Sequence, residues 1–130
     1  KEIDNVSEAT KRRENTILAI LLSGDNNIYQ IIKQNITIED FKYEIDKKIA
    51  KKLYEEFENG NSNINSIMND LSEEEQNHIT MIMAEDYGIE DVEKAIDDII
   101  QSYEKDKLNE RKFEILELLE NPTEENEKKN

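Results

Sequence analysis

Apolar residues recur with the period of an α-helix in each segment between two turn signals, beginning with residues 8–23. In that segment they stand at i, i+1, i+4 and i+5, at Ile17, Leu18, Leu21 and Leu22. This spacing gives one wide apolar face, which is typical of a helix at the centre of a core. Ser7 is placed to cap the helix at its start, and Gly24 is placed to end it in a left-handed conformation.

A short helix and a capped turn are expected next. The apolar side of the short helix is formed by Ile28, Ile31 and Ile32, and the helix should end near residues 34–35. Thr37 stands three residues before Asp40, which is close to a capping box, and Phe41 follows directly. This turn is therefore predicted to place one aromatic ring in the core.

A long amphipathic helix is predicted for residues 44–58, and the turn at Asn59-Gly60 ends it. Its apolar positions have a helical period and are Ile45, Ile49, Ala50, Leu53, Tyr54 and Phe57. The lysines of the segment lie on another side and are Lys47, Lys48, Lys51 and Lys52. We expect the apolar side to face the core and the lysine side to be solvated.

Two shorter helices are expected between Gly60 and Gly88. The apolar side of the first consists of Ile64, Ile67, Met68 and Leu71. Ser72 and Glu75 form a full capping box at the head of the second helix, which should end near Tyr87. The residues of this second helix that are expected to face inward are Ile79, Ile82 and Met83.

The last part of the chain, residues 89–120, is its longest periodic element. A first apolar stripe consists of Ile89, Val92, Ile96, Ile99, Ile100 and Tyr103. After a polar stretch a second set follows out of phase, at Leu108, Phe113, Ile115, Leu116 and Leu119. This pattern predicts one long helix or two nearly continuous ones. Asn121-Pro122 resembles the start of another helix.

These elements predict an all-α protein, because no segment shows strict alternation of apolar and polar residues between turn signals. We expect a linker at residues 1–7 and a multi-helix bundle at residues 8–103. A long helix should lead into residues 104–130, which we interpret as the first arm and the turn of a truncated helical hairpin. The chain begins with Lys1 and not with Met, which suggests a fragment of a larger protein.

Composition and charge narrow the function classes. The 130 residues include no cysteine, which excludes disulfides and thiolate metal ligands. With 32 acidic against 17 basic residues, the net charge of -15 argues against nucleic-acid binding, which needs clustered Lys and Arg. The longest apolar run, at residues 17–22, is too short to span a bilayer, and no signal peptide is visible. We therefore expect a cytoplasmic protein that binds neither nucleic acid nor membrane.

Candidate catalytic groups are few. His78 stands one turn after Glu74, a spacing that would allow a metal or general-base role. No second His, no Cys and no His-Glu-x-x-His spacing accompanies it, so we interpret His78 as a partly exposed structural residue. The chain also lacks a Gly-rich phosphate loop and a Gly-x-Ser-x-Gly elbow. We expect no catalysis, no cofactor and no metal site.

The order of signals from Glu14 to Gly60 resembles the helicase-binding C-terminal domain of bacterial DNA primase (DnaG type). The shared features are a buried helix, a short apolar helix, a capped turn ending in Ile38-Glu39-Asp40-Phe41, and a long helix that stops at Asn59-Gly60. The segment from Gly88 to Ile100 is similar to the last bundle helix in primases. The segment from Lys107 to Leu119 is similar to the first arm of their terminal hairpin.

The resemblance implies a non-catalytic interaction module that docks on the N-terminal domain of the hexameric replicative helicase (DnaB type). It also implies that the zinc ribbon and the polymerase domain of a primase lie outside this chain. The expected contacts are apolar at Leu108, Phe113, Leu116 and Leu119, with a polar rim at Lys107, Arg111 and Lys112. Alternatively, Leu108, Ile115 and Leu119 hold the hairpin together, which would leave Phe113 and Leu116 as the interface.

Two other interpretations remain open. The N-terminal collar domain of the replicative helicase shares the opening pattern and predicts self-association. It usually carries an Ile-Asp motif where this chain has Ser62-Asn63-Ile64-Asn65, and that departure favours primase. An unrelated acidic helical adaptor or nucleic-acid mimic would rest on the net charge alone and would bind a basic protein in a salt-sensitive way. We expect a monomer, or a weak dimer through the exposed hairpin arm.

Overall fold

The computed structural model describes residues 5–120. Within this range the chain forms six α-helices, one 3-10 turn and no strand: α1 (Glu8–Leu21), α2 (Asn26–Asn35), η1 (Ile38–Asp40), α3 (Glu44–Glu58), α4 (Ile64–Asn69), α5 (Glu73–Ala84) and α6 (Val92–Glu120). The predicted all-α class and the long last helix are therefore confirmed. The further helix expected at Asn121-Pro122 lies outside the described residues.

The helix starts use the capping residues expected from the sequence. At the start of α1, Ser7 Oγ accepts a hydrogen bond of 3.1 Å from the backbone N–H of Thr10. At the start of α5, Ser72 and Glu75 form a full capping box, in which each side chain accepts from the other residue's backbone N–H at 3.1 Å. These bonds satisfy N–H groups that have no partner inside their own helix. Both predicted caps are confirmed.

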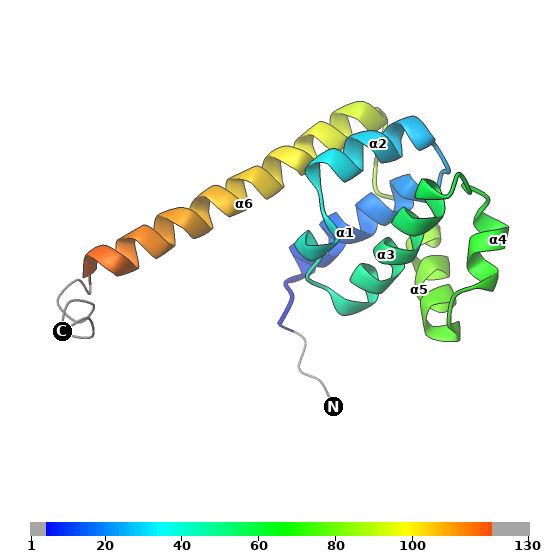
Figure 1. The fold of residues 1–130 in the computed structure, drawn as a ribbon, viewed down its shortest axis with the longest axis horizontal. Helices are drawn as coiled ribbons and strands as arrows, with labels where there is room; N and C mark the ends of the chain where they lie inside the picture. The colour runs from blue at the N-terminus through cyan, green and yellow to red at the C-terminus, as the bar shows by residue number, and fades with distance from the viewer. Residues whose placement is uncertain (1–4, 121–130) are drawn as a thin grey trace. The chain divides into compact units, whose positions relative to one another are not determined.

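Helices α1 and α3 form the centre of the first of two compact units, Lys1–Ile96. Helix α1 packs against α2, α3 and α5, while α3 also packs against α2, α4, α5 and the η1 turn. Figure 1 shows α2 on one side of α1 and α3, and α5 on the other side. The buried apolar residues of the two central helices are Ile17, Leu18, Ile20, Leu21, Ile49, Ala50, Leu53 and Phe57. The predicted central core helix is thus confirmed.

The start of α3 differs from the expected pattern. Ile45 is only partly buried, whereas the neighbouring Asp46 has no exposed surface. Phe41, from the capped turn before α3, is buried as predicted. The first turn of α3 therefore presents a carboxylate, and not an aliphatic group, to the interior of the bundle.

Helix α5 is shorter than expected and buries a narrower stripe. It ends at Ala84 and not near Tyr87. Its buried residues are Glu75, Ile79 and Ile82. Met83, which was expected to face inward, is 58% exposed. It lies about 40° around the helix axis from Ile79 and about 100° from Ile82, at the edge of the stripe and in the last turn of the helix.

Helix α6 begins in the first unit and continues without a break into the second unit, Asp97–Asn130. The sequence pattern left open one long helix or two nearly continuous ones, and the structure has one continuous helix. Of the first apolar stripe, Ile96 and Tyr103 are buried as the pattern indicated, Ile89, Ile99 and Ile100 are partly buried, and Val92 is 40% exposed. The predicted domain boundaries, after residues 7 and 103, stay predictions.

Candidate interaction surface on α6

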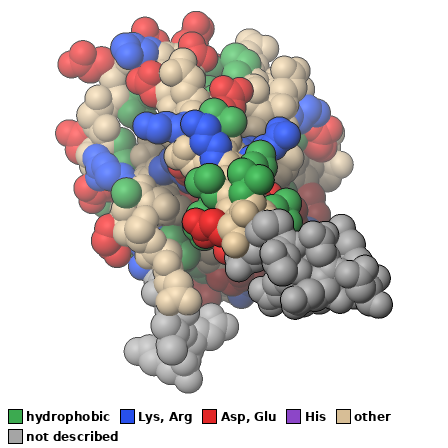
Figure 2. Space-filling model, turned by 90° about the vertical axis from the view of Figure 1, so that its left-hand side faces the viewer, with side chains coloured by type: hydrophobic (Ala, Val, Ile, Leu, Met, Phe, Trp, Pro, Cys, Tyr) green, Lys and Arg blue, Asp and Glu red, His purple; other side chains and the backbone are tan. Residues whose placement is uncertain are grey.

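The distal half of α6 carries exposed apolar side chains. Every residue from Glu104 to Glu120 is exposed. The large apolar side chains of this stretch are between 53% and 68% exposed and are Leu108, Phe113, Ile115, Leu116, Leu118 and Leu119. On the face of the molecule in Figure 2, apolar side chains lie at the surface beside basic and acidic ones. Because burying such groups is favourable by about 25 cal/mol per Å², a concentration of them on one helix marks an interaction surface.

Helical geometry divides these side chains between two faces. Leu108, Ile115 and Leu119 lie within about 40° of one another around the helix axis, and we call these three residues the seam. Leu116 lies about 100° from Ile115, and Phe113 lies about 160° from it. The residues predicted to hold a hairpin together and the residue Phe113 therefore lie on different faces of α6.

The predicted basic rim lies on the side of the seam. Arg111, Lys112 and Lys107 lie about 40°, 60° and 80° from Ile115, respectively. All three lie at least about 100° from Phe113. The seven predicted site residues are thus all exposed on one helix, but they do not form a single surface.

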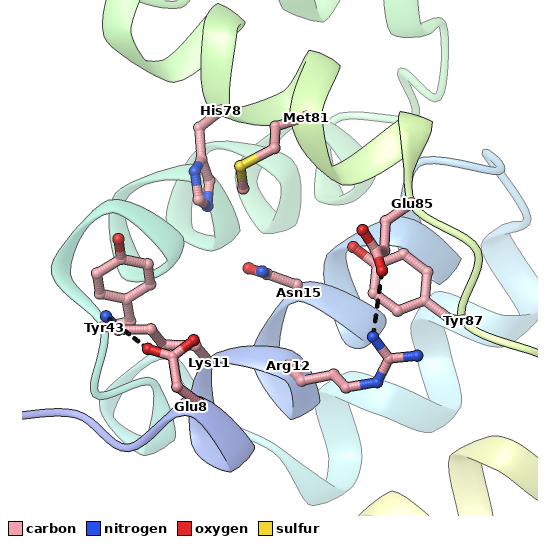
Figure 3. A pocket seen from close by; sticks show the side chains of 9 residues that line it. All are labelled: Glu8, Lys11, Arg12, Asn15, Tyr43, His78, Met81, Glu85 and Tyr87. Atoms are coloured by element: carbon pink, nitrogen blue, oxygen red, sulfur yellow. Dashed lines mark hydrogen bonds and ion pairs between the residues drawn. The ribbon is translucent and has the colours of Figure 1, made fainter.

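A hollow in the first unit is formed by α1, α5 and the residues that precede α3 and follow α5 (Figure 3). It has a volume of about 480 Å³ and is lined by Glu8, Lys11, Arg12, Asn15, Tyr43, His78, Met81, Glu85 and Tyr87. Lys11 Nζ lies 4.7 Å from the ring centre of Tyr43, and the Arg12 guanidinium lies 5.2 Å from that of Tyr87. Each cation also pairs with a carboxylate of the hollow at 3.5 Å. The charges at its rim are therefore balanced.

His78 lines this hollow and is held by a buried carboxylate. Its Nε2 atom lies 2.7 Å from Oδ1 of Asp46, and only 11% of the His78 side chain is exposed. With the Asn15 amide oriented so that its nitrogen faces Asp46, that nitrogen lies 2.7 and 3.0 Å from the two carboxylate oxygens. Burial raises the pKa of Asp46, and the hydrogen bond to His78 opposes the rise. The partner of His78 is therefore Asp46 of α3, and not Glu74.

A second buried carboxylate, that of Glu14, ties α1 to the start of α3. Its two oxygens accept hydrogen bonds from the backbone N–H of Lys42 at 2.7 Å and of Tyr43 at 3.1 Å. Burial raises the pKa of Glu14, while these two bonds oppose the rise. Both amides directly precede α3, where N–H groups have no helical partner. Glu14 thus caps α3 from another helix.

Neither buried carboxylate is apparent from residue type, because Asp and Glu are almost never fully buried unless they are paired. Their spacing does carry a signal. Glu14 lies three residues before Ile17, and Asp46 lies three residues before Ile49. Each carboxylate therefore extends the apolar face of its helix by one turn. An acidic residue in register with an apolar stripe is the feature that would have indicated them.

Protein-family models, curated proteins and solved structures give no match to this chain. Among residues 5–120, no three His, Asp or Glu side chains are grouped as they would be around a metal ion. No helix in the described part of the chain combines the length and the hydropathy needed to cross a membrane. The surface of α6 and the pattern of the sequence are therefore the features of this chain that bear on its function.

Proposed function

We propose that this chain is the helicase-binding domain of a bacterial DNA primase, a cytoplasmic interaction module that has no catalytic activity of its own. It docks on the N-terminal domain of the hexameric replicative helicase and keeps primer synthesis at the replication fork. The observation that supports the proposal is the run of exposed apolar side chains on distal α6. An exposed apolar helix face of this kind binds by inserting its side chains into a groove of the partner.

Phe113 and Leu116 are the proposed helicase contacts, because they lie off the seam. In this arrangement Leu108 and Leu119 stabilise the hairpin together with Ile115. The cations Lys107, Arg111 and Lys112 form the polar rim of the seam. The net charge of -15 favours a protein partner over the phosphate backbone of DNA or RNA.

Calorimetric titration of the cognate helicase hexamer tests the proposal. We expect saturable binding by this chain, or by the chain extended past Asn130 if the hairpin requires its second arm. No heat from either form, with a helicase verified as a hexamer, would rule out the proposed function. Self-association of the chain in sedimentation, without helicase binding, would favour the collar domain. Salt-sensitive binding to an unrelated basic protein would favour the acidic adaptor.

A further inference from the structure

The charged side chains of residues 106–120 are separated by sign around helix α6. The acidic residues of this stretch within about 60° of Phe113 are Asp106, Glu110, Glu117 and Glu120. The basic residues lie at least about 100° from Phe113 and are Lys107, Arg111 and Lys112. All seven of these side chains are exposed. The ring of Phe113 therefore stands on an acidic face, and the seam stands on a basic face.

We infer that Phe113 binds an apolar pocket that is edged by Lys or Arg side chains of the partner. This inference rests on the proposed function and specifies the chemistry of the helicase groove. An aromatic ring that is 62% exposed gains most by entering a pocket that excludes water. The carboxylates around the ring are repelled by an acidic pocket edge and attracted by a basic one. The net charge of -15 steers the chain toward a basic surface at longer range.

A second copy of the chain fits this face less well. In a two-fold dimer through Phe113, the acidic residues of both copies would face one another, and such like-charge contacts are unfavourable. Contact between the Phe113 face of one copy and the seam of another would match in charge. That arrangement is head-to-tail, so it produces assemblies that grow with concentration. Sedimentation of the chain alone over a range of concentrations detects such growth, and finding it would overturn the inference.

The test compares charge reversals on α6 with charge reversals in the first unit. The variant Glu110→Lys/Glu117→Lys changes the acidic face, and Glu55→Lys/Glu90→Lys makes the same change in net charge at exposed positions of the first unit. We expect the α6 variant to bind the helicase hexamer about tenfold more weakly and the control to bind within about twofold of wild type. The difference should shrink as salt is raised, because exposed charges are screened.

A third variant, Arg111→Glu/Lys112→Glu, tests the seam side. We expect its affinity to stay within about twofold of wild type. Loss of affinity in this variant, with none in Glu110→Lys/Glu117→Lys, would place the docking face at the seam and overturn the inference. Equal losses in the acidic-face variant and its control would also overturn it, because they would reflect net charge alone.

Absence of binding by the wild-type chain would instead refute the proposed function itself. Circular dichroism of each variant verifies that α6 stays helical.

Discussion

The Nε2 atom of His78 lies 2.7 Å from Oδ1 of Asp46, a carboxylate with no exposed surface. Asn15 donates to the same carboxylate, so α1, α3 and α5 meet at one acidic group. A buried polar group without partners is destabilising, because it has lost its hydrogen bonds to water and forms none with the protein. The stability of the bundle should therefore be sensitive to Asp46.

Replacing Asp46 with Ala should lower the free energy of unfolding by about 3 kcal/mol, because His78 and Asn15 would then lack their buried acceptor. Urea denaturation of wild type and variant measures this difference. The matched control is Glu55→Ala, at an exposed position of the same helix, which should change the free energy by at most about 0.5 kcal/mol. Equal losses in the two variants would show that the contacts of Asp46 add nothing to the stability of the fold.

The raised pKa of Glu14 should make the stability of the fold depend on pH. In the unfolded chain this carboxyl titrates near the ordinary Glu value of 4.5, and in the folded chain it titrates at a higher pH. The folded state therefore binds the proton more tightly, and this contribution to stability is fully present below the unfolded pKa. It is lost as the pH rises through the folded pKa.

Wild type should accordingly lose free energy of unfolding relative to Glu14→Gln as the pH rises above the ordinary Glu value of 4.5. Urea denaturation of both proteins at a series of pH values gives this difference. The same comparison with Glu55→Gln, at an exposed position, should show little change with pH. If the stability of wild type rose relative to Glu14→Gln, the bonds from Lys42 and Tyr43 would outweigh burial, contrary to the direction stated for Glu14.

Phe113→Ala should weaken binding to the helicase hexamer by about 1 to 3 kcal/mol, which is the range for an aromatic residue at the centre of an interface. The helicity and Tm of the chain should not change, because the ring is exposed. Met83→Ala is the matched control, since Met83 is 58% exposed but lies on α5. Unchanged affinity of Phe113→Ala together with a lowered Tm would make Phe113 a structural residue instead.

Gly24→Ala should destabilise the fold more than Gly88→Ala. Both glycines have positive φ, at 81° and 66°, where a side chain is unfavourable by about 1 to 2 kcal/mol. A Cβ atom at Gly24 would also lie 3.0 Å from the carbonyl oxygen of Ser62, whereas nothing lies within 4 Å at Gly88. We expect losses of about 2 and 1 kcal/mol in urea denaturation. Equal losses would mean that the contact with Ser62 relaxes without cost.

The helices and their caps could be predicted because their causes are local. The apolar period of α1, the Ser7 cap and the Ser72–Glu75 box all depend on residues within a few positions of one another. The burial of Asp46 could not be predicted in the same way, because its partners His78 and Asn15 come from two other helices. Glu14 likewise bonds the backbone near α3, whose position depends on the packing of the whole bundle.

The residues of the candidate surface could be predicted from the sequence, but their arrangement around the helix axis could not. Leu108, Phe113 and Lys112 were all identifiable from the amphipathic pattern of the last segment. Whether that segment is one helix or two remained open, and the angle between any two side chains depends on the answer. In one continuous α6, Phe113 lies apart from the basic residues, so the predicted apolar and basic sets separate.

The cap that Glu14 places on α3 also affects the time scale on which two loop amides exchange their hydrogens. The N–H groups of Lys42 and Tyr43 lie outside any helix, where exchange with solvent is ordinarily fast. Each is bonded to the Glu14 carboxylate of α1, 28 and 29 residues away in sequence, so neither can exchange until that bond breaks. Their exchange rates therefore report the contact between α1 and the start of α3, from a segment that would otherwise report only on its own mobility.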